Sequence, residues 1–198
     1  MDFDEIRPGL WRWTAVHPEW KPDQKPDSPG DWPPDVGCVA YRGPDALVLI
    51  DPLVDEDGWP KLDALVESSG KPVRVLLTIP WHERSRRAAL DRYSGSDAVP
   101  NGVEAMEIQR AGEVVFWIPE HRALVPGDRI LGALEGGLRV CPESWLRYLD
   151  SGLTGVELRA ELRRLLDLPV EFVLVSHGES VLEHGREALW AALEPEGR

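Results

Sequence analysis

The sequence has few cysteines and no long hydrophobic run. Only two of its 198 residues are cysteine. We interpret Cys38 and Cys141 as two buried thiols in a reducing compartment, because neither a disulfide nor a metal pair is indicated by their spacing. The longest apolar runs, such as Ala46–Ile50 and Val114–Ile118, have the length of a β-strand and are too short to cross a membrane. These absences argue against a secreted disulfide scaffold and a membrane protein.

The N-terminal segment also lacks the features of a secretory signal. Residues Met1–Glu5 are acidic and contain no apolar core. We therefore expect a soluble protein located in the cytoplasm.

Positive charge is scarce. The sequence has 22 Lys and Arg residues against 35 Asp and Glu residues, a formal net charge of −13. Nucleic-acid binding requires clustered basic side chains, and the one basic cluster, formed by Arg84, Arg86 and Arg87, is predicted to lie on a solvated helix face. We therefore do not expect a nucleic-acid partner. The acidity itself favours solubility and does not identify a substrate.

Common catalytic motifs are missing as well. The sequence contains no nucleophile elbow, no phosphate-binding P-loop and no GxGxxG dinucleotide motif. Any active site must therefore be sought among isolated polar residues.

Hydrophobic periodicity and turn residues predict an α+β protein, which we treat as one domain over residues 1–198. The predicted strands are Leu10–Val16, Val36–Arg42, Ala46–Ile50, Val73–Thr78, Val103–Gln109, Glu113–Ile118, Arg122–Val125 and Glu171–Ser176. The predicted helices are Trp59–Ser68, Glu83–Tyr93, a short one beginning at Pro142, one behind the capping box Thr154–Glu157, and Glu183–Leu193.

Residues 17–35 form a segment rich in Pro, Asp and Trp without any period. A structureless loop of this length is often a lid or a binding loop. An alternative is a surface excursion that its tryptophans pin to the domain, and the sequence does not separate the two.

Polar residues stand where four predicted strands end. They are Asp51 in Ile50-Asp51-Pro52, the stretch Thr78–Ser85, Asp128 in Pro126-Gly127-Asp128, and His177 in Ser176-His177-Gly178. A single Asp or His at a strand end is usually a cap or turn former. The order and spacing of the four together carry more information.

This order resembles that of the metallo-β-lactamase-fold family, over roughly Leu10 to Leu193. The resemblance implies a four-layer αββα sandwich in which strand-end loops hold one or two metal ions. It places Thr78–Ser85 at the family's HxHxDH motif. Asp128 matches the aspartate that bridges two metals, and His177 matches the late histidine of the second site.

The sequence departs from the family at the motif itself. The two spaced histidines are replaced by Ile79 and Trp81, the motif aspartate by Glu83 and the last histidine by Arg84. The first two cannot ligate a metal, and the arginine repels a cation. His82 falls on a position that is normally not a ligand. An ordinary dinuclear zinc site is therefore not expected.

Two interpretations of the altered motif stay open. The first, which the lost ligands favour, is a metal-free pocket without a cofactor that binds a small molecule or a partner protein, with Arg84 paired to Asp128 or Glu83. The second is a hydrolase of an ester, thioester, amide or phosphoester. It would hold one zinc, manganese or iron ion through His82, Asp128 and His177, with Glu83 or Asp51 transferring a proton.

A third and plainer interpretation is an unrelated α/β domain in which these residues are caps. It predicts that His82, Asp128 and His177 lie far apart.

Overall fold

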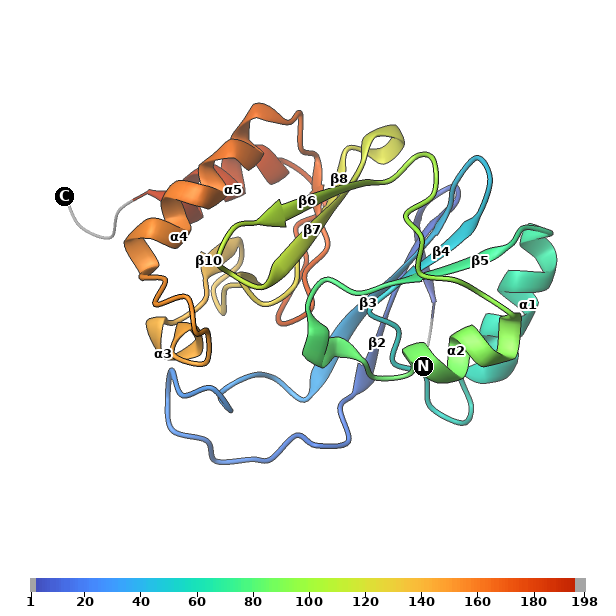
Figure 1. The fold of residues 1–198 in the computed structure, drawn as a ribbon, viewed down its shortest axis with the longest axis horizontal. Coiled ribbons are helices and arrows are strands. Elements are labelled where there is room, and N and C mark those ends of the chain that lie inside the picture. Colours follow the sequence, from blue (N-terminus) through green and yellow to red (C-terminus); the bar gives the residue numbers. More distant parts are fainter. Residues whose placement is uncertain (1–2, 195–198) are drawn as a thin grey trace.

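Two β-sheets face each other in the computed structural model (Figure 1). The structure describes residues 3–194, so Met1 and Asp2 of the acidic N-terminal segment lie outside the described residues. The first sheet has the order β1-β2-β3-β4-β5. Its strands are β1 (Asp4–Arg7), β2 (Leu10–Val16), β3 (Asp35–Arg42), β4 (Leu47–Ile50) and β5 (Val73–Leu76). Only β4 and β5 are parallel, so their carboxyl ends reach the same edge.

The second sheet has the order β11-β8-β7-β6. Its strands are β6 (Glu104–Ile108), β7 (Glu113–Ile118), β8 (Ala123–Val125) and β11 (Phe172–Val173). A separate hairpin joins β9 (Ile130–Gly132) to β10 (Leu138–Val140).

Helices cover the outer face of each sheet (Figure 1). Helices α1 (Trp59–Ser69) and α2 (Arg86–Tyr93) lie on the first sheet, and α4 (Gly155–Leu162) and α5 (Gly185–Leu193) lie on the second. Shorter helical elements are η1 (Pro80–His82), η2 (Pro119–His121), α3 (Glu143–Leu146) and η3 (Arg163–Asp167).

Side-chain alternation along the strands produces three separate hydrophobic clusters, one for each boundary between layers. In β4, Val48 and Ile50 join the cluster between the two sheets, whereas Leu49 packs with the α1 and α2 side chains. In β7, Phe116 faces the first sheet and Trp117 faces the cluster of α4 and α5. Three buried boundaries require four layers, which confirms the predicted αββα sandwich.

Several element boundaries differ from the prediction. The helix expected from Glu83 begins at Arg86, because η1 forms a separate turn and Arg84 has a left-handed φ of +36° that interrupts the helix. The strand expected over Glu171–Ser176 is assigned only at Phe172–Val173. Strands β1, β9 and β10 were not predicted, since each has only three or four residues.

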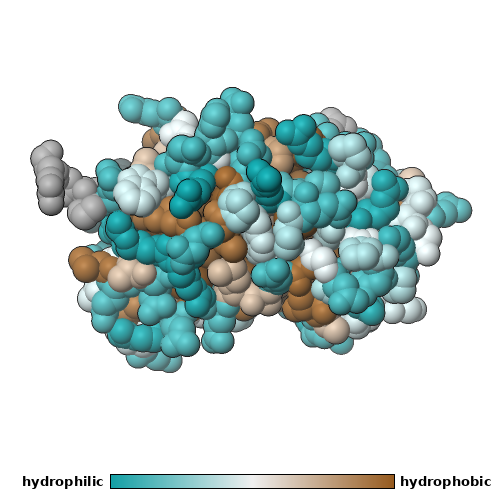
Figure 2. Space-filling model, turned by 90° about the horizontal axis from the view of Figure 1, so that it is seen from above, coloured by the Kyte–Doolittle hydropathy of each residue, from teal (hydrophilic) through white to brown (hydrophobic). Residues whose placement is uncertain are grey.

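The surface is mostly hydrophilic on the face away from residues 17–35 (Figure 2). Both cysteines are buried and free, as expected. Among residues 3–194, no helix is both long enough and apolar enough to span a bilayer.

The predicted capping box begins α4 and generates a stability prediction. Thr154 Oγ1 accepts from Glu157 N at 3.3 Å, and the Glu157 carboxylate accepts from Thr154 N at 2.9 Å. We expect Thr154→Ala to lower the free energy of unfolding by about 1 kcal/mol in urea titrations, because an N-terminal N–H loses its acceptor. The exposed control Val156→Ala should cause no loss. Equal stability of Thr154→Ala and wild type would contradict the role of the cap.

Candidate functional site

Asp51 anchors the segment that follows β5. The parallel pairing of Ile50 with Leu76 brings Asp51, which has a φ of +49°, beside Thr78. Asp51 Oδ1 accepts from Thr78 N at 2.9 Å, and Oδ2 accepts from the Thr78 hydroxyl. A non-glycine residue with positive φ is strained and persists where its surroundings hold it, as these hydrogen bonds do.

His82 is fixed at both ring nitrogens. Its Nδ1 lies 2.9 Å from Asp51 Oδ2, and its Nε2 lies 3.0 Å from Asp128 Oδ1. Burial lowers the pKa of His82, but the charges of Asp128 and Asp51 outweigh this effect and raise the pKa to about 9. Without a metal ion, the ring is therefore an imidazolium at neutral pH.

Asp128, in the loop between β8 and β9, accepts one hydrogen bond and lies close to two imidazoles. Trp81 Nε1 donates to Oδ2 at 2.7 Å. The other oxygen, Oδ1, lies 3.0 Å from His82 Nε2 and 3.3 Å from His177 Nε2, although neither ring N–H is well aligned on it. Burial raises the pKa of Asp128, but the charge of His82 and the contacts with both imidazoles outweigh it and hold the pKa well below its usual range.

His177 is brought to the site by a contact between the sheets. Gly37 N donates to Ser176 O at 2.7 Å, and Val36 forms a β-bridge with His177. A Cβ at position 37 would collide with the carbonyl oxygen of Val175, so glycine is required for this approach. Burial, aided by the charges of His82 and Arg84, lowers the pKa of His177, so its imidazole is neutral at neutral pH.

The three side chains predicted as metal ligands therefore meet. Ligand atoms of His82, Asp128 and His177 lie within 4.8 Å of one another, and all three residues are buried. This convergence contradicts the interpretation of these residues as scattered caps.

Glu113 was not predicted as a site residue, yet it holds the Asp128 loop. Its Oε1 accepts from Gly127 N at 3.1 Å and its Oε2 accepts from Arg129 N at 2.9 Å. Burial raises the pKa of Glu113 to about 7, although the charge of Arg129 opposes the shift. The sequence feature that could have identified Glu113 is its place as the one carboxylate at the start of an otherwise apolar predicted strand, Glu113–Ile118.

Arg84 does not pair with Asp128 or Glu83, which corrects the prediction. Its Nη1 donates to the carbonyl oxygens of Gly37 and Asp51 at 3.1 and 3.0 Å, and its Nη2 donates to Ser176 Oγ at 2.7 Å. The left-handed φ of Arg84 turns the chain so that its side chain lies between β3 and Ser176.

The two residues predicted to transfer a proton occupy different places. Asp51 is buried behind His82 and reaches the cluster only through that imidazole. The Glu83 side chain is half exposed and lies 3.4 Å from Arg86, outside the pocket lining. The geometry therefore brings Asp51 to the cluster and leaves Glu83 outside it.

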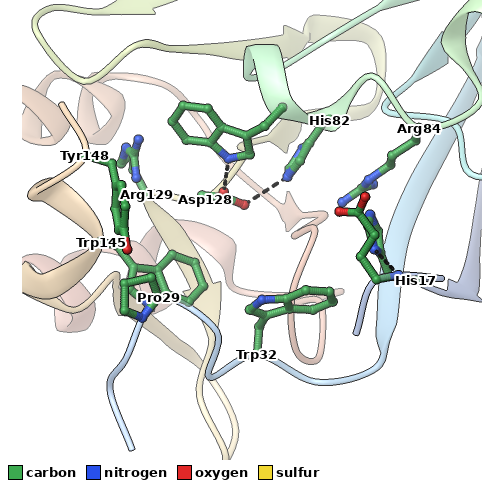
Figure 3. Close-up of a pocket in the computed structure, with 11 residues that line it drawn as sticks. His17, Pro29, Trp32, His82, Arg84, Asp128, Arg129, Trp145 and Tyr148 are labelled. Atoms are coloured by element: carbon green, nitrogen blue, oxygen red, sulfur yellow. Dashed lines mark hydrogen bonds and ion pairs between the residues drawn. The ribbon is translucent and has the colours of Figure 1, made fainter. Parts of the chain in front are cut away.

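A pocket of about 340 Å³ opens over His82 and Asp128 (Figure 3). The remaining lining residues are His17, Glu19, Pro29, Trp32, Trp81, Arg84, Arg129, Trp145 and Tyr148. The fully buried Arg129 was missed by sequence reasoning because it follows Asp128 directly and looks like a turn residue. Trp145 and Tyr148 were missed because no motif connects α3 with the site.

The loop of residues 17–35 forms one wall of this pocket (Figure 3). Trp145 Nε1 donates to Ser28 O at 2.9 Å, and Trp20 Nε1 donates to Trp32 O at 2.9 Å. The Trp32 ring lies 5.3 Å from that of His177. Each interpretation of the loop therefore describes part of the structure. Tryptophans pin the loop to the domain, and the loop also lines the pocket.

Solved structures with a similar fold include metallo-β-lactamases. A metallo-β-lactamase from Erythrobacter litoralis is 14% identical with a TM-score of 0.59, covering 96% of this chain and 95% of that one. The DIM-1 metallo-β-lactamase, in a crystal exposed to ceftazidime, is 10% identical with a TM-score of 0.57, covering 97% and 95%. No protein-family model and no curated protein sequence matches the chain. The chain thus has the metallo-β-lactamase fold, as the resemblance implied.

The raised pKa of Glu113 predicts a pH-dependent stability. Between pH 4.5 and 7, the folded state holds a proton on Glu113 that the unfolded state releases, so this group's contribution falls as pH rises through that range. Relative to wild type, we expect Glu113→Gln to gain about 2–3 kcal/mol in the free energy of unfolding between pH 5 and pH 8. Urea titrations at both pH values measure the difference.

Glu107→Gln, which removes an exposed carboxylate on β6, is the matched control for loss of one charge. A difference between Glu113→Gln and wild type that is the same at both pH values would contradict the shift.

Proposed function

We propose that the protein is a hydrolase with a single metal ion held by His82 Nε2, Asp128 Oδ1 and His177 Nε2. The spacing of these donors carries the proposal. Zinc bonds of 2.0–2.1 Å in tetrahedral geometry separate neighbouring ligand atoms by about 3.3 Å. The distances from Asp128 Oδ1 to the two Nε2 atoms are 3.0 and 3.3 Å, in keeping with that value.

Supporting hydrogen bonds also suit a metal centre. Imidazole ligands usually donate their second N–H to a carboxylate, a backbone carbonyl or a water, which fixes the tautomer and the ring orientation. Asp51 Oδ2 lies 2.9 Å from His82 Nδ1 and fits this role. Trp81 holds the outer oxygen of Asp128, so Oδ1 remains directed at the imidazoles.

The residues do not fit a second ion. Ile79 and Trp81 supply no lone pair of use to a metal, and the Arg84 guanidinium is directed to Ser176 beside His177. Two histidines and one carboxylate are a donor set that zinc, manganese or iron can use.

A bound ion of this kind polarises a carbonyl or phosphoryl oxygen and makes water a stronger nucleophile at neutral pH. The residues of the chain provide the rest of the site. Asp51 keeps a proton of His82 on Nδ1, so that His82 Nε2, once deprotonated, would be free to hold an ion. The tryptophan wall limits access of bulk water and orients a substrate, which we expect to be an ester, thioester, amide or phosphoester.

A metal-free binding protein is the second candidate. It is favoured by the contacts of Asp128, whose two oxygens already face Trp81 Nε1 and both imidazoles. In this case His82, Asp128 and His177 would form a structural hydrogen-bond network, and the pocket would bind a small molecule without catalysing a reaction.

Metal content separates the two candidates. For protein purified without chelator, we expect close to one zinc, manganese or iron ion per chain by elemental analysis, and a higher melting temperature with added zinc. Asp128→Asn and His177→Gln should each lose the ion, whereas His184→Gln, which removes an exposed histidine at the start of α5, should keep it. Folded protein that neither retains metal nor responds to zinc would refute the single-ion centre.

The role of Asp51 generates a separate prediction. In Asp51→Asn, an amide N–H₂ facing His82 Nδ1 favours the tautomer with its proton on Nε2, which cannot ligate a metal. We expect zinc affinity, measured by competition with a chromophoric chelator, to weaken about 10- to 100-fold while circular dichroism stays unchanged. An unchanged affinity in a folded variant would show that Asp51 does not orient a ligand.

A further inference from the structure

Two arginines of the pocket wall have only neutral partners in the described structure. Arg84 donates to two carbonyl oxygens and to Ser176 Oγ. Arg129 donates from Nε and Nη2 to Ala111 O at 3.2 and 3.0 Å. Within residues 3–194, no carboxylate lies at ion-pair distance from either guanidinium, so neither charge is neutralised by a direct contact.

Negative charge in the same pocket is limited. Asp128 is engaged by Trp81 and the two imidazoles. Glu19 lines the pocket, but its residue is exposed to solvent, which screens its charge. With two arginines against the two carboxylates of Asp128 and Glu19, the pocket lining has no net formal charge, whereas the chain as a whole has −13.

His17 adds a neutral donor beside Arg84 (Figure 3). Its Nδ1 accepts from Glu19 N at 3.2 Å, which leaves the ring proton on Nε2. Burial and then the charge of Arg84 lower the pKa of His17, although the charge of Glu19 opposes this shift. An N–H donor beside a guanidinium that, within residues 3–194, has only neutral hydrogen-bond partners suits an anionic oxygen.

The opposite part of the pocket is aromatic. Trp32, Trp81, Trp145 and Tyr148 line it, and the rings of Trp32 and Trp145 both approach His177, at 5.3 and 6.0 Å between centroids. Figure 3 places Trp145 and Arg84 at opposite ends of the cavity, with Trp32 between Trp145 and His17, whose ring lies 5.2 Å from that of Trp32. A volume of about 340 Å³ accommodates one or two fused rings.

We propose that the pocket recognises an aromatic carboxylate, with its ring against Trp32 and Trp145 and its carboxylate at Arg84. This inference rests on the proposed function in one respect: in a substrate, the same aromatic ring would carry the hydrolysable ester, thioester or amide, placed next to His82 and Asp128. Hydrolysis would add water across the acyl bond and release an acid with an alcohol, thiol or amine. Binding of the ring and its carboxylate does not itself require the metal ion.

Three probes separate the contribution of the ring from that of the charge. Quenching of tryptophan fluorescence or calorimetry would give the Kd of 2-naphthoate, of 2-naphthalenemethanol and of cyclohexanecarboxylate. The second probe keeps the ring without the charge, and the third keeps the charge without the aromatic ring. We expect 2-naphthoate to bind at least tenfold more tightly than either. Equal affinity for naphthoate and the alcohol, or for naphthoate and cyclohexanecarboxylate, would overturn the proposal.

Variants locate the binding in this pocket. Trp32→Leu should weaken naphthoate binding at least fivefold, whereas Trp190→Leu, the control for an exposed tryptophan on α5, should leave it unchanged. Arg84→Gln should weaken binding of naphthoate but not of the alcohol. Arg84→Gln could also disturb the fold, because Arg84 links the two sheets. Glu19→Gln therefore serves as a second electrostatic test. Loss of this exposed negative charge should tighten naphthoate binding about two- to fivefold. Weaker or unchanged binding in Glu19→Gln would contradict the proposed charge recognition.

The same titrations with chelator-treated and zinc-loaded protein distinguish this inference from the proposed function. If naphthoate binds chelator-treated protein and the protein takes up no zinc, the recognition of an aromatic carboxylate would be supported and the metal centre refuted. Zinc uptake without preference for naphthoate would support the metal centre and refute the aromatic carboxylate.

Discussion

The buried carboxylate of Asp51 organises the centre of this molecule. A carboxylate that leaves water must find donors for its oxygens, and Asp51 finds all of them in the segment after β5: Thr78 N, the Thr78 hydroxyl and His82 Nδ1. These hydrogen bonds fix where the chain turns after Leu76 and how the His82 ring is oriented. The direction of His82 Nε2, and with it the contact to Asp128, follows from Asp51.

The second sheet uses a buried carboxylate in the same way. Glu113, at the start of β7, accepts from the backbone N–H groups on both sides of Asp128. Thr78 joins the two systems, because its carbonyl oxygen accepts from Val114 N at 2.7 Å while its side chain binds Asp51. A Cβ at Gly127 would lie 2.6 Å from Thr78 Oγ1, so the loops meet closely only with glycine there. Each sheet thus positions one side of the cluster, and the donors are preorganised before any ligand arrives.

The sequence predicted most of the scaffold because burial imposes periods that can be read directly. The strands β2, β3, β4, β6 and β7 and the capping box at Thr154 were predicted close to their observed bounds. The αββα layers and the convergence of His82, Asp128 and His177 were implied by the family resemblance, which rested on the order of the polar strand ends. The direction of a side chain after an irregular turn was not predictable, since it depends on φ values such as those of Asp51 and Arg84. For this reason the predicted ion-pair partners of Arg84, Asp128 and Glu83, were wrong.

Long-range supports were harder still to predict. Glu113 lies 14 residues before Gly127, and Trp145 lies 117 residues after Ser28, yet each pair is joined by a hydrogen bond. Local patterns carry no information about which distant backbone group a buried polar side chain will meet. The 17–35 loop is the clearest case, because its place over the pocket depends on Trp145 in α3, an element with no apparent relation to the loop in sequence.

Arg84 marks the physical difference between this chain and the family pattern that it resembles. A histidine ligand at that position would face an ion with a lone pair, whereas a guanidinium brings a permanent positive charge and five N–H donors. The three hydrogen bonds that Arg84 donates go to neutral oxygens, so the charge stays available to the pocket while the side chain links Gly37 to Ser176. One substitution thereby changes a ligand position into a cationic wall. An arginine of this kind can attract an anion, but it offers no coordination position, and the chemistry of the site is confined to the side of His82, Asp128 and His177.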